Sequence, residues 1–395
     1  MLEAVDAESD VLTGSPASPW STRLQFRRWL SEVRTSLAEP PSGADYRARL
    51  DSVRMLQARL YDVGWARIGW PEHLGGLGGD ARHRAVINDE LAAAGFSSRY
   101  ALEHLEILAP ALVAHWERTQ LREMLPRLLR GDELWCQGFS EPDAGSDLVA
   151  MRTSATLDGD EYVIRGHKVW TSWALYAQRC VVLARTGTPS QRHRGLSVFF
   201  VDLDSAGIEV RPLRQANGLE ELAEVTFDEV RVPRSALVGP EGGGWPVALD
   251  VLSCERSAFA WLRQARLHSR VEALAQSADV GSADELGNVL VDLFAVRMAS
   301  ASAVNDLADG RFIGPAAAPV KALLTDAEQH IYDLAHRLYG SHLALGVRSD
   351  AARMGEWQEE YLFSRAVSIY GGTRQMQLTT IARFLLELPT PERRT

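Results

Sequence analysis

The stretch VLSCERSAFAWL places one carboxylate, that of Glu255, among apolar residues. At helical spacing, Val251 and Leu262 lie on the same face as Glu255. Arg256 is adjacent and points in another direction, and the residues three or four positions from Glu255 carry no charge. Either a distant segment pairs with this carboxylate, or it stays unpaired and takes up a proton. An apolar environment raises a carboxyl pKa by desolvation, which suits a general base near neutral pH.

A second chemistry-bearing stretch, GFSEPDAGSD at residues 138–147, is dense in Gly, Ser and Asp and precedes a strand-like region. Backbone N–H groups and hydroxyls gathered in such a turn suit the binding of phosphate oxygens. An ordinary capped turn has the same composition, and the residues alone leave both interpretations open.

Two further stretches combine aromatic residues with small or polar ones. In KVWTSWA, residues 168–174, an indole beside hydroxyls suits a flat ring with polar edges, such as a flavin, although Trp in a strand is more often part of a core. In SIYGGTRQMQ, residues 368–377, paired glycines followed by Thr and Gln allow a ligand to approach the backbone closely. A helix C-cap with a turn is the alternative for that stretch.

Three compositional regions must position these stretches. Helical periodicity runs from about residue 20 to 132 and returns after the glycine run at 242–244, where we expect one long helix that includes Glu255. Between them, short β-branched runs with turn signals, such as EYVIRGHKVWTS after DGDE, predict antiparallel strands. Sequential rather than alternating elements exclude a doubly wound sheet and favour an α+β fold.

The chain of 395 residues is long enough for two or three domains. We divide it into a disordered tail (1–18), an N-terminal helical domain (19–133), a central β domain (134–240), a C-terminal helical bundle (241–389) and a short tail (390–395).

Composition limits the classes of function. A net charge of -10 argues against a nucleic-acid partner, which needs a dense basic footprint. No apolar run approaches the roughly 18 residues that span a bilayer, and the N-terminus lacks the apolar segment of a secretory signal. Three cysteines without CxxC spacing suit a reducing cytoplasm, where we expect the protein to reside.

Motifs of several enzyme classes are absent from the sequence. It contains no HExxH, GxSxG or GxGxxG, and its two lysines, Lys168 and Lys321, follow His and Val rather than Gly. Zinc, P-loop, Rossmann and serine-hydrolase sites are therefore disfavoured, and we expect no metal.

Taken together, the stretches resemble the acyl-CoA dehydrogenase family over about residues 20–389. LWCQGFSEPDAGSDL looks like its flavin-binding signature, DEYVIRGHKVWTSWA like its second signature and IYGGTRQMQLTTIARFLLELP like its C-terminal one. GWARIGWPEHLGGLGG is similar to the family's N-terminal region. The resemblance implies an N-terminal helical domain, a central β-barrel-like domain, a C-terminal four-helix bundle, and FAD as cofactor.

The first signature is implied to bind the cofactor through four residues. Phe139 and Ser140 would line the flavin ring, with the Ser140 hydroxyl near the pyrimidine edge. Gly145 and Ser146 would approach the phosphate region of substrate and cofactor.

The other two signatures are implied to complete the FAD site. Trp170 would stack beside the isoalloxazine, with Thr171 next to it as a cofactor-binding residue. Ser172 would stand where the family's Ser or Thr bonds flavin N5. Thr373 and Gln375 would contact the adenosine part.

One departure from the family concerns the catalytic carboxylate. Many members carry it in a Tyr-Glu-Gly-Thr motif, and Gly371 occupies that Glu position here. A branch of the family keeps it on the first long helix of the C-terminal bundle, where Glu255 stands. The resemblance therefore implies that Glu255 is the general base. Gly371 would leave space for it and offer a backbone N–H to the thioester oxygen.

In the implied reaction Glu255 removes the α-proton of an acyl-CoA while the β-hydrogen leaves as hydride to FAD N5, giving the trans-2-enoyl-CoA. An electron-transfer flavoprotein is the implied electron acceptor. Two alternatives stay open: a flavin monooxygenase or oxidase of the same fold, and one subunit of a heteromeric acyl-CoA dehydrogenase.

A second departure concerns the arginine that usually reaches the FAD of a neighbouring subunit. Residues 271–296 contain neither Lys nor Arg, and Arg270 and Arg297, which flank this gap, are the candidates to replace it. Some relatives work as heteromeric pairs in which a second subunit supplies missing cofactor contacts. The implied assembly is a homodimer, a homotetramer, or a heterotetramer with a related subunit.

Overall fold

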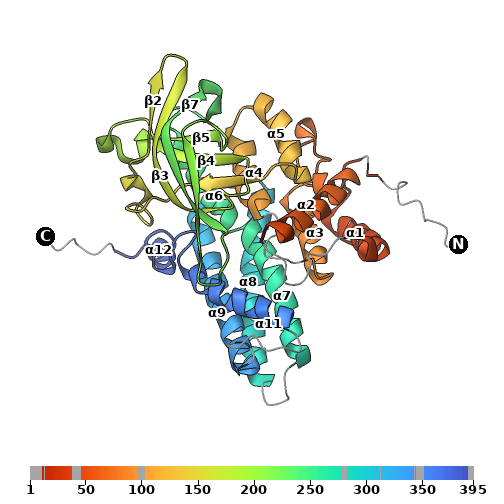
Figure 1. Ribbon diagram of the computed structural model, residues 1–395. Helices are drawn as coiled ribbons and strands as arrows, with labels where there is room; N and C mark the ends of the chain where they lie inside the picture. The colour runs from red at the N-terminus through yellow and green to blue at the C-terminus, as the bar shows by residue number, and fades with distance from the viewer. Residues whose placement is uncertain are drawn as a thin grey trace.

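The computed structural model describes residues 11–12, 14–37, 46–96, 103–277, 283–311, 313–341, 343 and 351–389. Helices come first, strands follow and helices return, which confirms the predicted α+β order. In Figure 1 the N-terminal helices lie beside the β region, and the long C-terminal helices extend below both. The predicted tails fall largely outside the described residues.

The N-terminal region consists of helices. They are α1 (Pro19–Val33), α2 (Tyr46–Asp62), α3 (Ala81–Ala93), α4 (Glu103–His115) and α5 (Arg118–Arg130). Ser18 caps α1 by accepting a hydrogen bond from the Ser21 N–H. Upstream of this cap, the Leu12 N–H donates to the Val63 carbonyl at 3.1 Å. This part of the predicted tail is therefore packed against the helices.

The central region forms one sheet. Its strands are β1 (Trp135–Gly138), β2 (Ser154–Asp158), β3 (Glu161–Ser172), β4 (Arg179–Arg185), β5 (Leu196–Asp202), β6 (Ile208–Leu213), β7 (Leu222–Pro233) and β8 (Leu237–Val238). The order is β6-β7-β3-β2-β4-β5-β8, with β1 paired to β4. β2 and β3 pair antiparallel from Asp158 opposite Glu161, which confirms the antiparallel strands predicted around DGDE.

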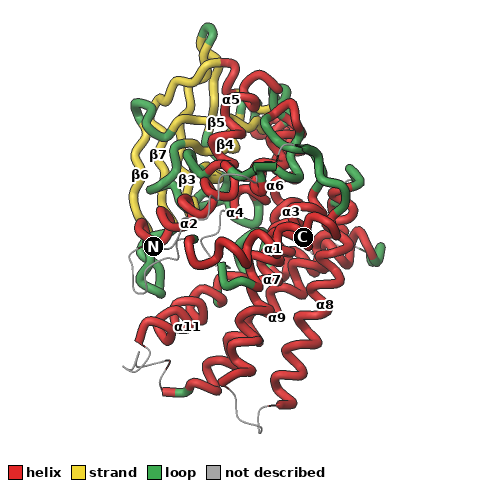
Figure 2. The backbone as a smooth tube through the Cα atoms, turned by 90° about the vertical axis from the view of Figure 1, so that its right-hand side faces the viewer, coloured by secondary structure: helices red, strands yellow, loops and turns green. Residues whose placement is uncertain are grey.

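The C-terminal region returns to helices. They are α6 (Gly244–Glu255), α7 (Ala258–Ser277), α8 (Ala283–Ala308), α9 (Ala318–Tyr339), α11 (Ala351–Ser364) and α12 (Arg374–Thr380), followed by a π-helical turn (Ile381–Leu385). Figure 2 shows α7, α8, α9 and α11 as a bundle. In the view of Figure 1, the bundle lies below the β region.

The single long helix expected after the glycine run is instead two helices, α6 and α7. At the break, the Arg256 N–H donates to the Ser253 carbonyl at 3.1 Å. The Ser257 hydroxyl donates to the same carbonyl at 2.7 Å. A serine hydroxyl that bonds the backbone competes with the regular helical ladder, and the three-residue spacing tightens the last turn. The break makes Glu255 the last residue of α6.

The core around the end of α6 is shared by all three regions. Five fully buried members of one cluster come from α4, β1, β4 and α6: Leu108, Leu112, Trp135, Val181 and Val251. Full burial of each such side chain stabilises the fold by ~1.5–3 kcal/mol. Val251 lies one turn before the carboxylate, so this packing fixes the backbone that carries Glu255.

One described helix, α8, is long and apolar enough to cross a bilayer by length and composition, which the sequence expectation had excluded. A core helix of a globular bundle passes the same test, and Val289, Leu293 and Val296 are fully buried. The opposite face exposes four apolar side chains, the α8 stripe: Leu290, Val291, Phe294 and Met298.

Candidate functional site

Glu255 is partly exposed at the C-terminal end of α6, beside the buried Cys254. Burial raises the pKa of its carboxyl above the ordinary value, and the charges of Lys321 and then Arg256 offset part of that rise. The C-terminus of a helix is the negative end of its dipole, which further disfavours a carboxylate. Among the described residues, no basic nitrogen forms an ion pair with Glu255 within 4.0 Å.

Gly371 lies in the turn before α12, with a φ of +62° that favours glycine. A Cβ at this position would lie 2.2 Å from Oε1 and 2.7 Å from Cδ of Glu255. The two positions predicted to be catalytic are therefore in contact. Any side chain at position 371 would displace the carboxylate.

Arg256 holds the turn that contains Gly371. Its Nε and Nη2 donate to the Gly371 carbonyl at 3.2 and 3.0 Å. Gln377 supports the same turn by donating to the Gly372 carbonyl at 3.0 Å. From the sequence, Arg256 was considered only as a partner for Glu255 and was rejected. Its contact with the Gly371 turn was missed, because a contact between segments so far apart in the chain leaves no local pattern.

Lys321 of α9 is a residue of this site that sequence reasoning missed. It is 3% exposed, and its Nζ lies 3.9 Å from the centroid of the Tyr370 ring. Burial lowers the pKa of Lys321 to about 8, against the opposing charges of Glu255 and Glu328. A signal was available: of 42 basic residues in the chain, only two are lysines.

A pocket with largely apolar walls lies between α2, α3, α4 and α7. Phe259 and Leu262 line it from α7, and Leu91 and Leu105 line it from the opposite helices. α7 begins directly after the turn that follows Glu255. Neither Glu255 nor Gly371 is among the residues that line this pocket.

The other lysine, Lys168 of β3, lies under the predicted phosphate-binding loop. It is fully buried and donates to Oε1 of Glu141 at 2.8 Å and to the Phe139 carbonyl at 3.0 Å. Glu141 also accepts the backbone N–H groups of Arg152 and Thr153 at 2.7 and 2.9 Å. The pair joins two of the stretches selected from sequence.

The residues of the first signature differ in their exposure to solvent. Gly145 and Ser146 are exposed, and Ser140 is partly exposed. Phe139 is 3% exposed and packs in the core, and its carbonyl accepts the hydrogen bond from Lys168.

In the second signature, the predicted residues differ in their exposure to solvent. Trp170 is 62% exposed, and Ser172, two positions on, is partly exposed. Thr171 is fully buried, and its hydroxyl has no hydrogen-bond partner in the described part of the chain. Its role in binding the cofactor stays a prediction. Trp170 also has a φ of +60°, a strained conformation of the kind found at functional sites.

In the third signature, Thr373 caps α12 by accepting the Met376 N–H at 3.2 Å, and Gln375 is exposed. Together with an exposed indole and two accessible serines, these polar groups fit a cofactor with a flat ring and polar edges. Within the described residues, no group of three or more His, Cys, Asp or Glu side chains is placed to hold a metal ion.

Three family profiles match consecutive parts of the chain. Acyl-CoA dehydrogenase, N-terminal domain, matches residues 25–132; the middle domain matches 136–230; and the C-terminal domain matches 242–386. The chain belongs to the acyl-CoA dehydrogenase family. It is therefore an oxidoreductase of acyl-CoA thioesters.

Relatives of this family member include acyl-CoA dehydrogenase IpdE1 of Mycobacterium tuberculosis, 36% identical over 93% of this chain and 97% of that protein. Among solved structures, the Tcur3481-Tcur3483 steroid ACAD has a TM-score of 0.78 and 25% identity, covering 95% of this chain and 98% of that one. The ChsE4-ChsE5 complex from Mycobacterium tuberculosis has a TM-score of 0.75 and 26% identity, covering 96% and 100%.

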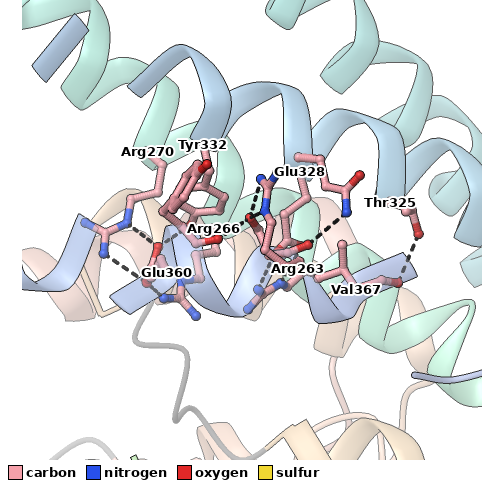
Figure 3. A network of polar contacts seen from close by, with 12 residues as sticks. Arg263, Arg266, Arg270, Thr325, Glu328, Tyr332, Glu360 and Val367 are labelled. Carbon is pink, nitrogen blue, oxygen red and sulfur yellow. Dashed lines mark hydrogen bonds and ion pairs between the residues drawn. The ribbon is translucent and has the colours of Figure 1, made fainter. Parts of the chain in front are cut away.

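The two arginines that flank the gap in basic residues are both engaged within this chain. Arg270 donates to Glu360 at 3.0 and 3.1 Å, as Figure 3 shows. Arg297 donates to Oδ2 of Asp89 at 2.7 Å. Carboxylates of this chain therefore already pair with both guanidinium groups, and a role of either arginine in binding FAD stays a prediction.

Arg270 belongs to a buried network that ties α7 to α9 and α11 (Figure 3). Arg263 pairs with Glu328, its Nε donating at 2.9 Å, and Arg266 pairs with Glu360. The network joins these three helices of the bundle.

Proposed function

We propose that this protein oxidises an acyl-CoA thioester to the trans-2-enoyl-CoA, with Glu255 as the base that takes the α-proton. The observation that carries the proposal is the contact between the Glu255 carboxylate and the Gly371 backbone. This carboxyl group has a raised pKa and no ion-pair partner among the described residues. Those properties suit a group that must alternate between charged and neutral forms.

We infer that FAD is the cofactor. Bound FAD supplies the acceptor for the hydride that leaves the β-carbon. The exposed Trp170 indole and the hydroxyls of Ser140 and Ser172 would hold the flavin ring, and Thr373 with Gln375 would hold the adenosine end.

The chain's own residues would carry out the proton transfer. Ionised Glu255 takes the α-proton at a carboxylate oxygen. The Gly371 N–H donates to the thioester oxygen, where negative charge develops. Arg256 fixes the orientation of this turn through the Gly371 carbonyl.

The assembly we propose includes a second subunit that covers the α8 stripe and contacts FAD. Two observations support this: Arg270 and Arg297 are engaged within the chain, and Phe294 is 60% exposed. One solved relative is described as a complex of two chains, ChsE4-ChsE5, which makes a heteromer the assembly to test against a homo-oligomer. We further propose an electron-transfer flavoprotein as acceptor. A cytoplasmic location would suit the free, buried cysteines.

Product analysis tests the reaction. The flavin-loaded protein is mixed with straight-chain, branched and steroid side-chain acyl-CoA esters, with an electron-transfer flavoprotein as acceptor. We expect a product that is lighter by two hydrogen atoms, formed without oxygen consumption. Oxygen uptake, or an added oxygen atom in the product, would instead favour an oxidase or a monooxygenase.

Expression tests the assembly. Protein that is colourless and inactive alone, but yellow and active when co-expressed with a related subunit, would indicate a heteromer. Protein that is yellow and active by itself would indicate a homo-oligomer.

A further inference from the structure

Lys321 is a buried cation with no established part in the proposed reaction. It lies on α9, 3% exposed, in a chain that uses arginine at all but two of its 42 basic positions. Ammonium is a compact point charge, whereas guanidinium is a broad planar fork. Lys321 therefore places a compact cation in a buried position where the rest of the chain would supply a guanidinium.

The surroundings of Lys321 connect it to the base. Its Nζ lies 3.9 Å from the centroid of the Tyr370 ring. The next residue, Gly371, is in contact with the Glu255 carboxylate. Among charged groups, Lys321 has the largest effect on the pKa of Glu255, and Glu255 has the largest effect on the pKa of Lys321.

The other charged groups that act on Lys321 have partners of their own. Arg256, from the turn before α7, donates to the Gly371 carbonyl. Arg263 of α7 and Glu328 of α9 pair with each other. The Tyr370 hydroxyl is neutral, because burial raises its pKa. In the part of the chain that the structure describes, Lys321 makes no ion pair within 4.0 Å, so its charge remains available to Glu255.

We propose that Lys321 is the positioning residue that sets the proton affinity of Glu255, keeping the base ionised in the free enzyme. This inference rests on the proposed role of Glu255. The ammonium favours the carboxylate before proton transfer and restores it afterwards, because a neutral carboxylic acid beside a buried cation loses its proton more readily than one beside an apolar group. A purely structural lysine, stacked on Tyr370, would contribute only to folding.

The pH dependence of kcat distinguishes these roles. Removing the cation in Lys321→Met raises the pKa of Glu255, so the acid limb of kcat moves to higher pH by about one pH unit or more. On the acid side of the limb, activity then falls about tenfold for each pH unit that the limb has moved, and it recovers at high pH. Lys321→Arg keeps the charge and therefore moves the acid limb less than Lys321→Met does.

A uniform loss of activity across pH, with the limb unmoved, would overturn the inference. Lys321→Gln serves as a second neutral variant if the Met variant does not fold. Infrared difference spectra of the protonated Glu255 carboxyl, identified by its loss in Glu255→Gln, give the same pKa without turnover. The same rise in this pKa in both neutral variants supports the inference, and a carboxyl band that titrates as in the wild type contradicts it.

The Glu255→Gln variant separates the two claims. If it keeps full activity, Glu255 is not the base and the proposed function fails with it. If it loses activity while the limb of Lys321→Met is unmoved, only the role of Lys321 fails.

Discussion

The two lysines of this chain lie in two buried sites that are built in opposite ways. In the β region, Lys168 donates to Glu141 at 2.8 Å, and Glu141 accepts two further backbone N–H groups. In the bundle, Lys321 meets the face of Tyr370 and acts on Glu255 without pairing to it within 4.0 Å, as far as the described residues go. The Glu141 carboxylate accepts hydrogen bonds from several donors, whereas the Glu255 carboxylate has no ion-pair partner within 4.0 Å among the described residues.

The two carboxylates therefore suit different roles, Glu141 a structural role and Glu255 a catalytic one. Burial alone would raise the pKa of Glu141, but the charge of Lys168 and the hydrogen bonds that the carboxylate accepts hold it below the ordinary value. Such a group resists protonation and is suited to fixing the loop at 138–147. Glu255 has the reverse property, a raised pKa, and is suited to taking up a proton.

Loss of Lys168 tests the architectural site and should have the largest effect on stability. Removing one partner of a buried pair leaves an uncompensated charge, so Lys168→Met should lower the free energy of unfolding by about 3–5 kcal/mol. Lys321→Met should lower it by only about 0.5–2 kcal/mol, the range of a cation–π contact. Urea denaturation of both variants measures the difference. Equal losses would remove the distinction between the two sites.

Substitution of Gly371 tests the reactive site. In Gly371→Ala, the Cβ would lie 2.2 Å from Oε1 of Glu255 and must displace the carboxylate. Turnover should fall by about 10²–10⁴-fold, the contribution of a positioned base, while the flavin stays bound. Gly355→Ala is the matched control, since a Cβ on that bundle helix meets nothing within 4 Å. Unchanged turnover in Gly371→Ala would separate Glu255 from the chemistry.

The sequence predicted the helix, strand, helix order and the nearness of Glu255 to Gly371, the latter through the family resemblance. The rarity of lysine could have drawn attention to Lys321, but its contact with Tyr370 could not be predicted, because a contact between a helix and a distant turn leaves no periodic signal. The break after Glu255 was missed because it depends on a serine hydroxyl bonding the backbone. The burial of Thr171 was not predicted, because a motif match transfers residue types and does not say which side chains are exposed.

The raised pKa of Glu255 should be visible in the pH profile of the wild-type protein. Because burial raises the pKa of Glu255 and only the carboxylate accepts the proton, kcat should fall as pH drops through a pKa above the ordinary value for glutamate. Below that pKa, activity should decline about tenfold per pH unit. Stopped-flow measurements across pH, with flavin occupancy checked at each point, provide the profile. An acid limb at the ordinary glutamate pKa would mean that Glu255 is not desolvated.

The smallest effect is expected where an arginine is already paired. Arg270→Gln should leave the affinity for FAD within about twofold, because Glu360 occupies this guanidinium and a charge-assisted bond to FAD is not lost. Arg297→Gln should behave alike, given its bond to Asp89. Fluorescence titration of flavin into apoprotein measures the affinity. A tenfold loss in either variant would assign that arginine to the cofactor after all.

Anaerobic reduction of the flavin by an acyl-CoA substrate tests the role of Glu255 most directly. Wild-type protein, Glu255→Gln and Glu255→Asp are each loaded with FAD and mixed with substrate in the absence of oxygen, and the bleaching of the flavin is followed. We predict that Glu255→Gln keeps its flavin but bleaches at least about 100-fold more slowly than wild type, with Glu255→Asp in between. Bleaching of Glu255→Gln at the wild-type rate would contradict the account.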